Sequence, residues 1–140
     1  MNRDDAWQLL NEYTKGDSLL KHAMGVEAAV RGYARKFGED EEAWGIVGLL
    51  HDFDYERWPT PEDHPFRGCE ILREKGYPEW VMRAILSHAD YSGVPRESRL
   101  DQRGGDGAGP ARLLVSLAPF RTMGQGNTSA ARPREHEPIT

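Results

Sequence analysis

Four histidines and one aspartate are the residues of this sequence whose types and positions could do chemistry. Three of them, His22, His51 and His88, each fall on the apolar stripe of a different expected helix. Asp52 directly follows His51. A buried imidazole without a partner costs about 1–3 kcal/mol, and a buried carboxylate without a cation is also costly. A single buried histidine is commonly a satisfied core residue, whereas three helices that each turn a histidine inward are harder to explain in that way.

A shared divalent metal ion would satisfy all of these groups at once. Imidazoles combined with a carboxylate suit a transition metal such as Fe, Mn, Zn or Co better than an all-oxygen site for Mg or Ca. The histidines would have to come from different helices, and sequence spacing alone does not bring them together. The pattern therefore indicates a metal centre and leaves open whether it forms.

The segments that carry these residues are expected to be helices joined by short turns. Apolar residues recur at helical spacing over residues 1–100, and period-two alternation is scarce. Gly38 and Gly76 are helix stops, and Asp40 is a helix start. The prediction is an all-α fold with helices over 3–14, 18–37 (capped by Asp17 or Ser18), 41–53, 64–75 (capped by Thr60 or Asp63) and 78–90.

The C-terminal part changes in composition near Leu100. Half of residues 101–140 are Gly, Ala, Arg or Pro, and lysine is missing there. Only 111–120 is apolar enough to pack against a partner. We therefore expect one helical domain over 1–100 and a largely disordered, irregular tail over 101–140.

Charge and cysteine content exclude several classes of function. The formal net charge of −5 and the lack of a basic block argue against nucleic-acid binding. The single cysteine, Cys69, cannot form a disulfide within the chain, and its place inside a helix favours a packing role. The N-terminus has no signal-peptide pattern, and no apolar run is long enough to span a membrane. The expectation is a cytoplasmic protein without a membrane partner.

Four stretches in chain order resemble the HD-domain superfamily of metal-dependent phosphohydrolases. They are LLKHAMGVEAAVRGYA, GIVGLLHDFD, DHPFRGCEILRE and AILSHAD. The resemblance implies an orthogonal all-α bundle that brings the histidines to one centre with one or two ions. It also implies hydrolysis of a small phosphate ester, expected to be a nucleotide, by a metal-bound water. The implied residues are His22, His51 and Asp52 as primary metal ligands, His64 and His88 as ligands of a second ion, and Asp52 as the bridging catalytic carboxylate. Lys21 and Arg67 lie beside these ligands in the sequence and could bind substrate phosphate. The alternative for both is an ordinary surface charge that keeps the protein soluble.

Two acidic residues next to the His-Asp pair, Asp54 and Glu56, could orient the attacking water. We expect instead that both are solvated loop acids.

The last ligand of the family, an aspartate on a later helix, has no clear counterpart. Only Asp101 and Asp106 follow Asp90, and Asp106 stands in RGGDGAGP, whose glycines and proline do not support a helix. One alternative function is therefore a catalytically impaired module that binds metal or nucleotide. Another is a helical interaction domain whose histidines are satisfied in the core.

The atypical tail has two explanations, a shifted reading frame in a GC-rich gene or natural divergence. In either case the helices that would close the bundle are missing. The apolar surface this exposes favours a homodimer or poor solubility.

Overall fold

The structure of the protein is a computed structural model, which describes residues 1–94. Over these residues the chain forms helices and no strand, which confirms the predicted all-α class. The helices are α1 (Arg3–Tyr13), α2 (Asp17–Phe37), α3 (Glu41–Leu50), α4 (Phe66–Glu74) and α5 (Glu79–Leu86), followed by a short 3₁₀ helix, η1 (Asp90–Ser92).

Side-chain caps and glycines define several helix ends. The Asn2 side chain accepts a hydrogen bond from the Asp5 N–H at the start of α1, and Asp40 does the same for Ala43 at the start of α3. Gly38 ends α2 in the left-handed conformation, with φ of 69°, which only glycine adopts without strain. The local sequence thus fixes where the first three helices begin or end.

Helix α3 lies at the centre of the fold. Every residue from Trp44 to Leu50 is buried, and α3 contacts α1, α2 and α5. Its closest neighbour is α2, because Gly48 has no side chain at the crossing. A Cβ at Gly48 would lie only 3.1 Å from the Cα of Glu27. The end of α3, where the His-Asp pair follows, is therefore held in the middle of the molecule.

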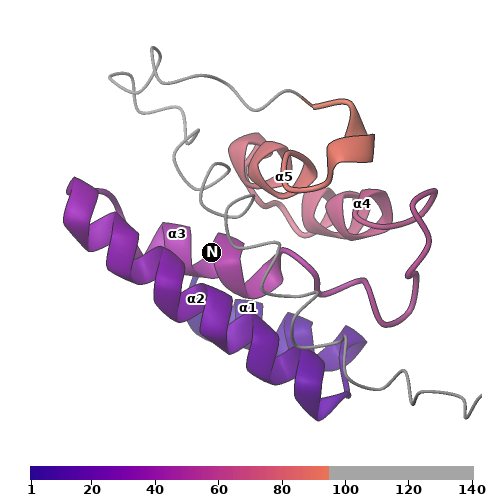
Figure 1. Cartoon of the computed structure of the whole chain (residues 1–140), viewed down its shortest axis with the longest axis horizontal. Helices are drawn as coiled ribbons and strands as arrows, with labels where there is room; N and C mark the ends of the chain where they lie inside the picture. Colours follow the sequence, from indigo (N-terminus) through magenta and orange to yellow (C-terminus); the bar gives the residue numbers. More distant parts are fainter. Residues whose placement is uncertain (95–140) are drawn as a thin grey trace, which may run out of the picture.

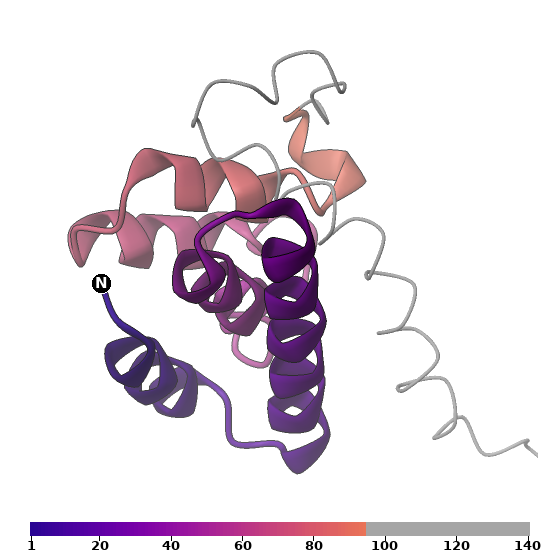
Figure 2. The same ribbon diagram turned by 90° about the vertical axis from the view of Figure 1, so that its left-hand side faces the viewer.

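The helices form two groups that cross each other. Helices α1, α2 and α3 lie together, while α4 and α5 lie side by side (Figure 1). The α4–α5 pair runs across the direction of α2 (Figure 2), as expected for an orthogonal bundle. One hydrophobic core joins both groups, with buried residues such as Leu10, Val30, Ile46, Leu72 and Ile85 from all five helices.

Three predicted helices are shorter than expected, at the ends that carry histidines. Helix α3 ends at Leu50 and not at residue 53, α5 ends at Leu86 and not at residue 90, and α4 begins at Phe66 and not at residue 64. The ring N–H of His51 and that of His88 each donate to the carbonyl three residues earlier, and such bonds compete with a regular helix.

Two further local expectations are corrected. The residues that flank the starts of α2 and α4 are Gly16 and Pro65, and neither helix has a side-chain cap bond from the expected residues. Tyr33 and Phe37 continue the helical spacing of apolar residues that predicts a buried face on α2, but they are 40% and 57% exposed. Helix α2 has 21 residues and α3 only 10, so the end of α2 extends past its main partner.

Several predictions fall outside the residues that the structure describes. They are the tail over 101–140, the apolar segment 111–120 and the aspartates Asp101 and Asp106. Within the described part of the chain, the helices are too short or too polar to cross a membrane.

Candidate metal centre

The predicted ligand residues meet around one carboxylate, that of Asp52. They form two groups, and within each group the ligand atoms lie within 4.8 Å of one another. The first group is His22, His51 and Asp52, and the second is Asp52, His64 and His88. The structure thus brings together, from four separate helical segments, all five residues that the sequence proposed as ligands.

Each oxygen of Asp52 faces one of the two groups. Oδ2 lies 3.0 Å from Nε2 of His51 and 3.5 Å from Nε2 of His22. Oδ1 lies 3.2 Å from Nε2 of His64 and 3.2 Å from Nε2 of His88. The carboxylate therefore stands between two pairs of imidazoles, and a carboxylate can bridge two cations in this position.

Helix ends position most of these side chains. His51 follows the last residue of α3, His64 precedes α4, and His88 follows α5 by two residues. His22 lies in the second turn of α2 and is the most accessible of the set, whereas the other four residues are buried. The centre thus lies deep among the helices and reaches the solvent side at His22.

Hydrogen bonds at Nδ1 leave the Nε2 atoms of three histidines facing Asp52. Nδ1 of His51 lies 2.7 Å from the Gly48 carbonyl, and Nδ1 of His88 lies close to the Ile85 carbonyl. Nδ1 of His64 lies 2.7 Å from Oδ1 of Asp54. Because carbonyls and carboxylates only accept, each Nδ1 must donate its hydrogen. In a neutral ring the lone pair is then on Nε2, the form in which a histidine binds a metal.

The nitrogen separations agree with ligands of a single ion. Two nitrogens bonded to one ion at about 2.0–2.1 Å lie about 2.9–3.4 Å apart for ligand angles of about 90–109°. Nε2 of His22 and Nε2 of His51 are 3.2 Å apart. Nε2 of His64 is buried and lies 3.2 Å from Oδ1 of Asp52. The donor set and its spacing fit a divalent transition metal.

The charges of the site follow from burial and from the neighbouring rings. Burial would raise the pKa of Asp52, but the imidazoles of His51, His22 and His64 outweigh burial and hold this pKa well below its usual value. Burial lowers the pKa of His51, and Asp52 offsets only part of this effect. Asp52 is therefore an anion near neutral pH.

His64 differs because it faces two carboxylates. Burial acts to lower its pKa, but Asp52 and Asp54 outweigh burial and raise the pKa of His64 to about 9. A proton on Nε2 thus balances the negative charge in the protein without metal. An ion bound there would take over this role and displace the proton.

The two predicted phosphate-binding residues lie on the surface next to ligands. The Lys21 ammonium is 2.8 Å from Asp17, one helical turn away. The Arg67 guanidinium is 3.2 Å from Asp63 and 3.5 Å from Glu70. Both cations pair with nearby carboxylates, and their role in binding phosphate stays a prediction.

The expectation for Asp54 is wrong, since this residue is buried and not a solvated loop acid. Its side chain is only 1% exposed, and both of its oxygens accept hydrogen bonds from buried donors. The expectation failed because burial of Asp54 depends on α4, which packs over it from later in the chain. Glu56 is exposed as expected, but its Oε2 accepts the backbone N–H groups of Lys15 and Gly16, at 2.9 Å each.

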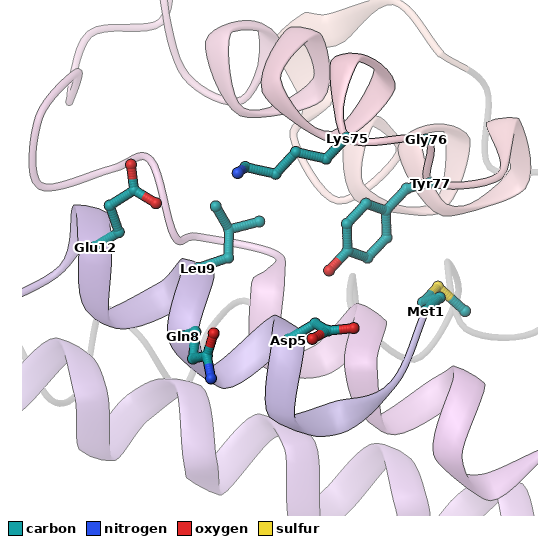
Figure 3. Close-up of a pocket in the computed structure, with 8 residues that line it drawn as sticks. All are labelled: Met1, Asp5, Gln8, Leu9, Glu12, Lys75, Gly76 and Tyr77. Atoms are coloured by element: carbon teal, nitrogen blue, oxygen red, sulfur yellow. The ribbon is translucent and has the colours of Figure 1, made fainter.

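A separate pocket of about 330 Å³ lies between α1 and the turn that joins α4 to α5 (Figure 3). In Figure 3, Lys75 and Tyr77 reach from this turn towards α1. Burial and the charge of Asp5 raise the pKa of Tyr77. The lining residues are Met1, Asp5, Gln8, Leu9, Glu12, Lys75, Gly76 and Tyr77. None of them belongs to the ligand set, so the pocket is distinct from the metal centre.

Over the described residues, the chain combines an all-α fold with four histidines around one buried aspartate. This combination is that of a helical protein with a site for divalent metal. The family model of the HD domain matches residues 19–116, which is more than half of the chain. The chain therefore belongs to the HD-domain family, in the superfamily of metal-dependent phosphohydrolases. No curated protein and no solved structure matches the chain.

The limits of the match bear on two other parts of the chain. Helix α1 precedes the matched residues, and the match ends at residue 116, inside the segment predicted as a tail. The predicted domain boundary at residue 100 and the parts played by Asp101 and Asp106 stay predictions.

Proposed function

We propose that this protein hydrolyses a small phosphate ester, with nucleotides as the expected substrates, at a centre of two divalent transition-metal ions. The observation that supports the proposal is the geometry of Asp52, because each of its two oxygens faces a different pair of imidazoles. Three of these rings donate from Nδ1 to fixed acceptors and so direct Nε2 to the carboxylate.

Each ion would have three protein ligands. His22, His51 and Oδ2 of Asp52 would hold one, and His64, His88 and Oδ1 of Asp52 would hold the other. When bound, such ions lower the pKa of coordinated water and neutralise charge on phosphoryl oxygens. The fixed Nδ1 hydrogen bonds mean that the protein would pay little to orient the rings for binding.

Lys21 and Arg67 are proposed to bind the substrate phosphate. A phosphate would replace the carboxylates with which they now pair. We expect Lys21→Ala and Arg67→Ala to raise KM while leaving metal content unchanged. Arg73→Ala is the matched control, because Arg73 is an exposed arginine on α4 that pairs with Glu79.

Metal content measured by plasma mass spectrometry tests the centre. The chain is purified without chelator and without a His-tag, and is then loaded with Mn²⁺, Fe²⁺, Zn²⁺ or Co²⁺. We expect two ions per chain in the wild type and one in each of the double variants His22→Ala/His51→Ala and His64→Ala/His88→Ala. Asp52→Ala should lose both. His136→Ala is the control, since it removes a histidine outside the proposed set. Wild-type levels of metal in Asp52→Ala would contradict the proposal.

Phosphate release separates hydrolysis from binding alone. The loaded protein is assayed with p-nitrophenyl phosphate and with nucleoside mono-, di- and triphosphates. Metal-dependent release that is lost in Asp52→Ala is the expected result. Stoichiometric metal without turnover on any of these esters would favour the alternative, a catalytically impaired module that binds metal or nucleotide.

The proposed homodimer has some support on α2. Met24, Tyr33 and Phe37 are large apolar residues that are exposed there, and the rings of Tyr33 and Phe37 stack at 6.1 Å. Light scattering coupled to size exclusion should give twice the mass of one chain. A Phe37→Glu variant should shift the mass to that of a monomer.

A further inference from the structure

Asp54 is a buried carboxylate next to the metal centre that belongs to neither group of ligands. It stands in the turn that follows the His-Asp pair and is 1% exposed. Its Oδ1 lies 2.7 Å from Nδ1 of His64, and its Oδ2 lies 2.9 Å from the backbone nitrogen of Gly68. Both oxygens thus face donors whose positions are fixed by the fold.

We infer that Asp54 is a positioning residue that sets the tautomer and the ring orientation of His64 for metal binding. This inference rests on the proposed function, in which His64 is a ligand. A carboxylate only accepts hydrogen bonds, so it requires the hydrogen to be on Nδ1 of His64 and leaves Nε2 to face Asp52. An outer carboxylate of this kind also fixes the ring against rotation.

The position of His64 in the chain explains why a side chain is needed here. His51 and His88 follow helices, and each finds its Nδ1 acceptor in the carbonyl three residues earlier. His64 stands ahead of α4, and its acceptor comes from a segment ten residues earlier. Asp54 therefore does for His64 what a helix carbonyl does for the other two rings.

Gly68 holds the carboxylate of Asp54 in its orientation. Its N–H belongs to the first turn of α4, where backbone donors have no partner within the helix. A Cβ at this position would lie 2.9 Å from Cγ and 2.9 Å from Oδ2 of Asp54. Glycine thus lets α4 approach closely enough for its N–H to fix Oδ2, so that only Oδ1 is left for His64.

The variant Asp54→Asn tests the inference because asparagine has one acceptor and one donor group. The Gly68 N–H can only donate, so the amide oxygen must face Gly68 and the amide NH₂ must face His64. Nδ1 of His64 then has to accept, which moves the hydrogen to Nε2 and blocks the nitrogen that would bind the ion. The same side-chain size is kept, and the bond to Gly68 is retained.

The measurement is Zn²⁺ affinity of the full chain, by competition with a chromophoric chelator. We expect one of the two ions to bind roughly 10- to 100-fold more weakly in Asp54→Asn, and the other to be retained. Glu62→Gln is the matched control, since it makes the same change of charge at an exposed acid of the same loop. In the His64→Ala background, Asp54→Asn should cause no further loss, because Asp54 acts through His64.

Each outcome decides between the inference and the proposed function. Wild-type affinity in Asp54→Asn, or an equal loss with and without His64, would overturn the positioning role and leave the metal centre standing. A wild-type chain that binds no Zn²⁺ would overturn the proposed function itself. If Asp54→Asn gives no cooperative thermal transition, Gly68→Ala replaces it. It should weaken the same ion, and unchanged affinity would again overturn the inference.

Discussion

Each of the buried histidines His51, His64 and His88 divides its two ring nitrogens between two tasks. Nδ1 donates to a fixed acceptor, and Nε2 faces Asp52. A buried imidazole with one unused nitrogen would cost free energy in an ordinary core. Three rings around one carboxylate share this arrangement of nitrogens, and we therefore consider them metal ligands and not packing residues.

Cys69 offers a test of burial at the residue scale. Burial and the neighbouring charge of Asp54 raise the pKa of Cys69 to about 12. A raised thiol pKa lowers the thiolate fraction, and at pH 8 a pKa of about 12 instead of 9 lowers it by about 10³-fold. We expect Ellman's reagent to react with native Cys69 at least about 10²-fold more slowly than with the chain in urea. Comparable rates in the two states would show that α4 and α5 open readily.

Sequence reasoning identified the five residues that the structure brings together and missed the burial of Asp54 next to them. Histidine and a following aspartate stand out by type, so His51 and Asp52 could be singled out without a structure. The burial of Asp54 could not be predicted in this way, because a carboxylate in a loop is usually solvated and only the approach of Gly68 buries it. The sequence does not show that the Gly68 N–H, from a later segment, donates to Asp54.

At the scale of elements, the turn between α1 and α2 is joined to the segment that follows the His-Asp pair. The buried hydroxyl of Thr14 donates to the Phe53 carbonyl at 2.9 Å. The carboxylate of Glu56 accepts from the backbone of the same turn, and Arg57 donates to the Glu12 carbonyl at 3.0 Å. This junction fixes the start of the helix that carries His22 relative to the ligands His51 and Asp52.

Thr14→Val tests this junction. Valine keeps the shape and leaves the Phe53 carbonyl without its donor, so we expect the free energy of unfolding to fall by about 1–3 kcal/mol. Urea denaturation monitored by circular dichroism measures the change. Thr60→Val is the control, since Thr60 is exposed and its hydroxyl contacts only Asp63, at 3.3 Å. An equal effect in the two variants would argue against a structural role for the junction.

The crossing of α2 and α3 is tested by a pair of glycine variants. Gly48→Ala gains about 1 kcal/mol in helix propensity, but its Cβ would meet the backbone of Glu27 at 3.1 Å, and crowding of this kind costs about 1–3 kcal/mol. The expected result is a net loss of roughly 1 kcal/mol. Gly25→Ala, on the exposed face of α2 with no atom within 4 Å, should instead stabilise by about 0.5–1 kcal/mol. Thermal melts of both variants measure the difference, and an equal gain in both would show that the helices separate without cost.

The elements could be predicted better in their number than in their ends. Apolar spacing, Asp40 and Gly38 were enough to separate α1, α2 and α3. The ends of α3 and α5 were overestimated because a histidine ring that bonds the carbonyl three residues earlier ends the helix there. Helix propensity does not predict whether a histidine ring makes this bond, because the bond depends on what the other ring nitrogen faces.

At the scale of the whole molecule, a cluster of ionic contacts packs beside α3, and the candidate metal centre lies at the C-terminal end of this helix. Glu27 of α2 is buried, and its carboxylate lies 2.7 Å from Nε of Arg3 and 3.0 Å from Nε of Arg31. A Cβ at Gly45 of α3 would collide with the Arg31 side chain at 2.5 Å, so α3 makes room for this cluster. Residue spacing alone could not show either convergence, and only the resemblance to a known family predicted that the histidines meet.

The metal centre should therefore control the stability of the whole fold. Asp52 contacts one residue of α2 and residues that flank α3, α4 and α5. An ion that binds only the folded chain adds free energy of RT ln(1 + [L]/Kd). At a free Zn²⁺ concentration of 100 times Kd this is about 2.7 kcal/mol per ion. We expect the melting temperature to rise with Zn²⁺ and to return to its starting value after chelation.

Asp52→Asn should not respond to Zn²⁺, because the carboxylate shared by both groups is gone. A melting temperature that ignores Zn²⁺ in the wild type would mean that the five residues form a polar core without a metal, whereas an equal rise in Asp52→Asn would place the bound ion elsewhere.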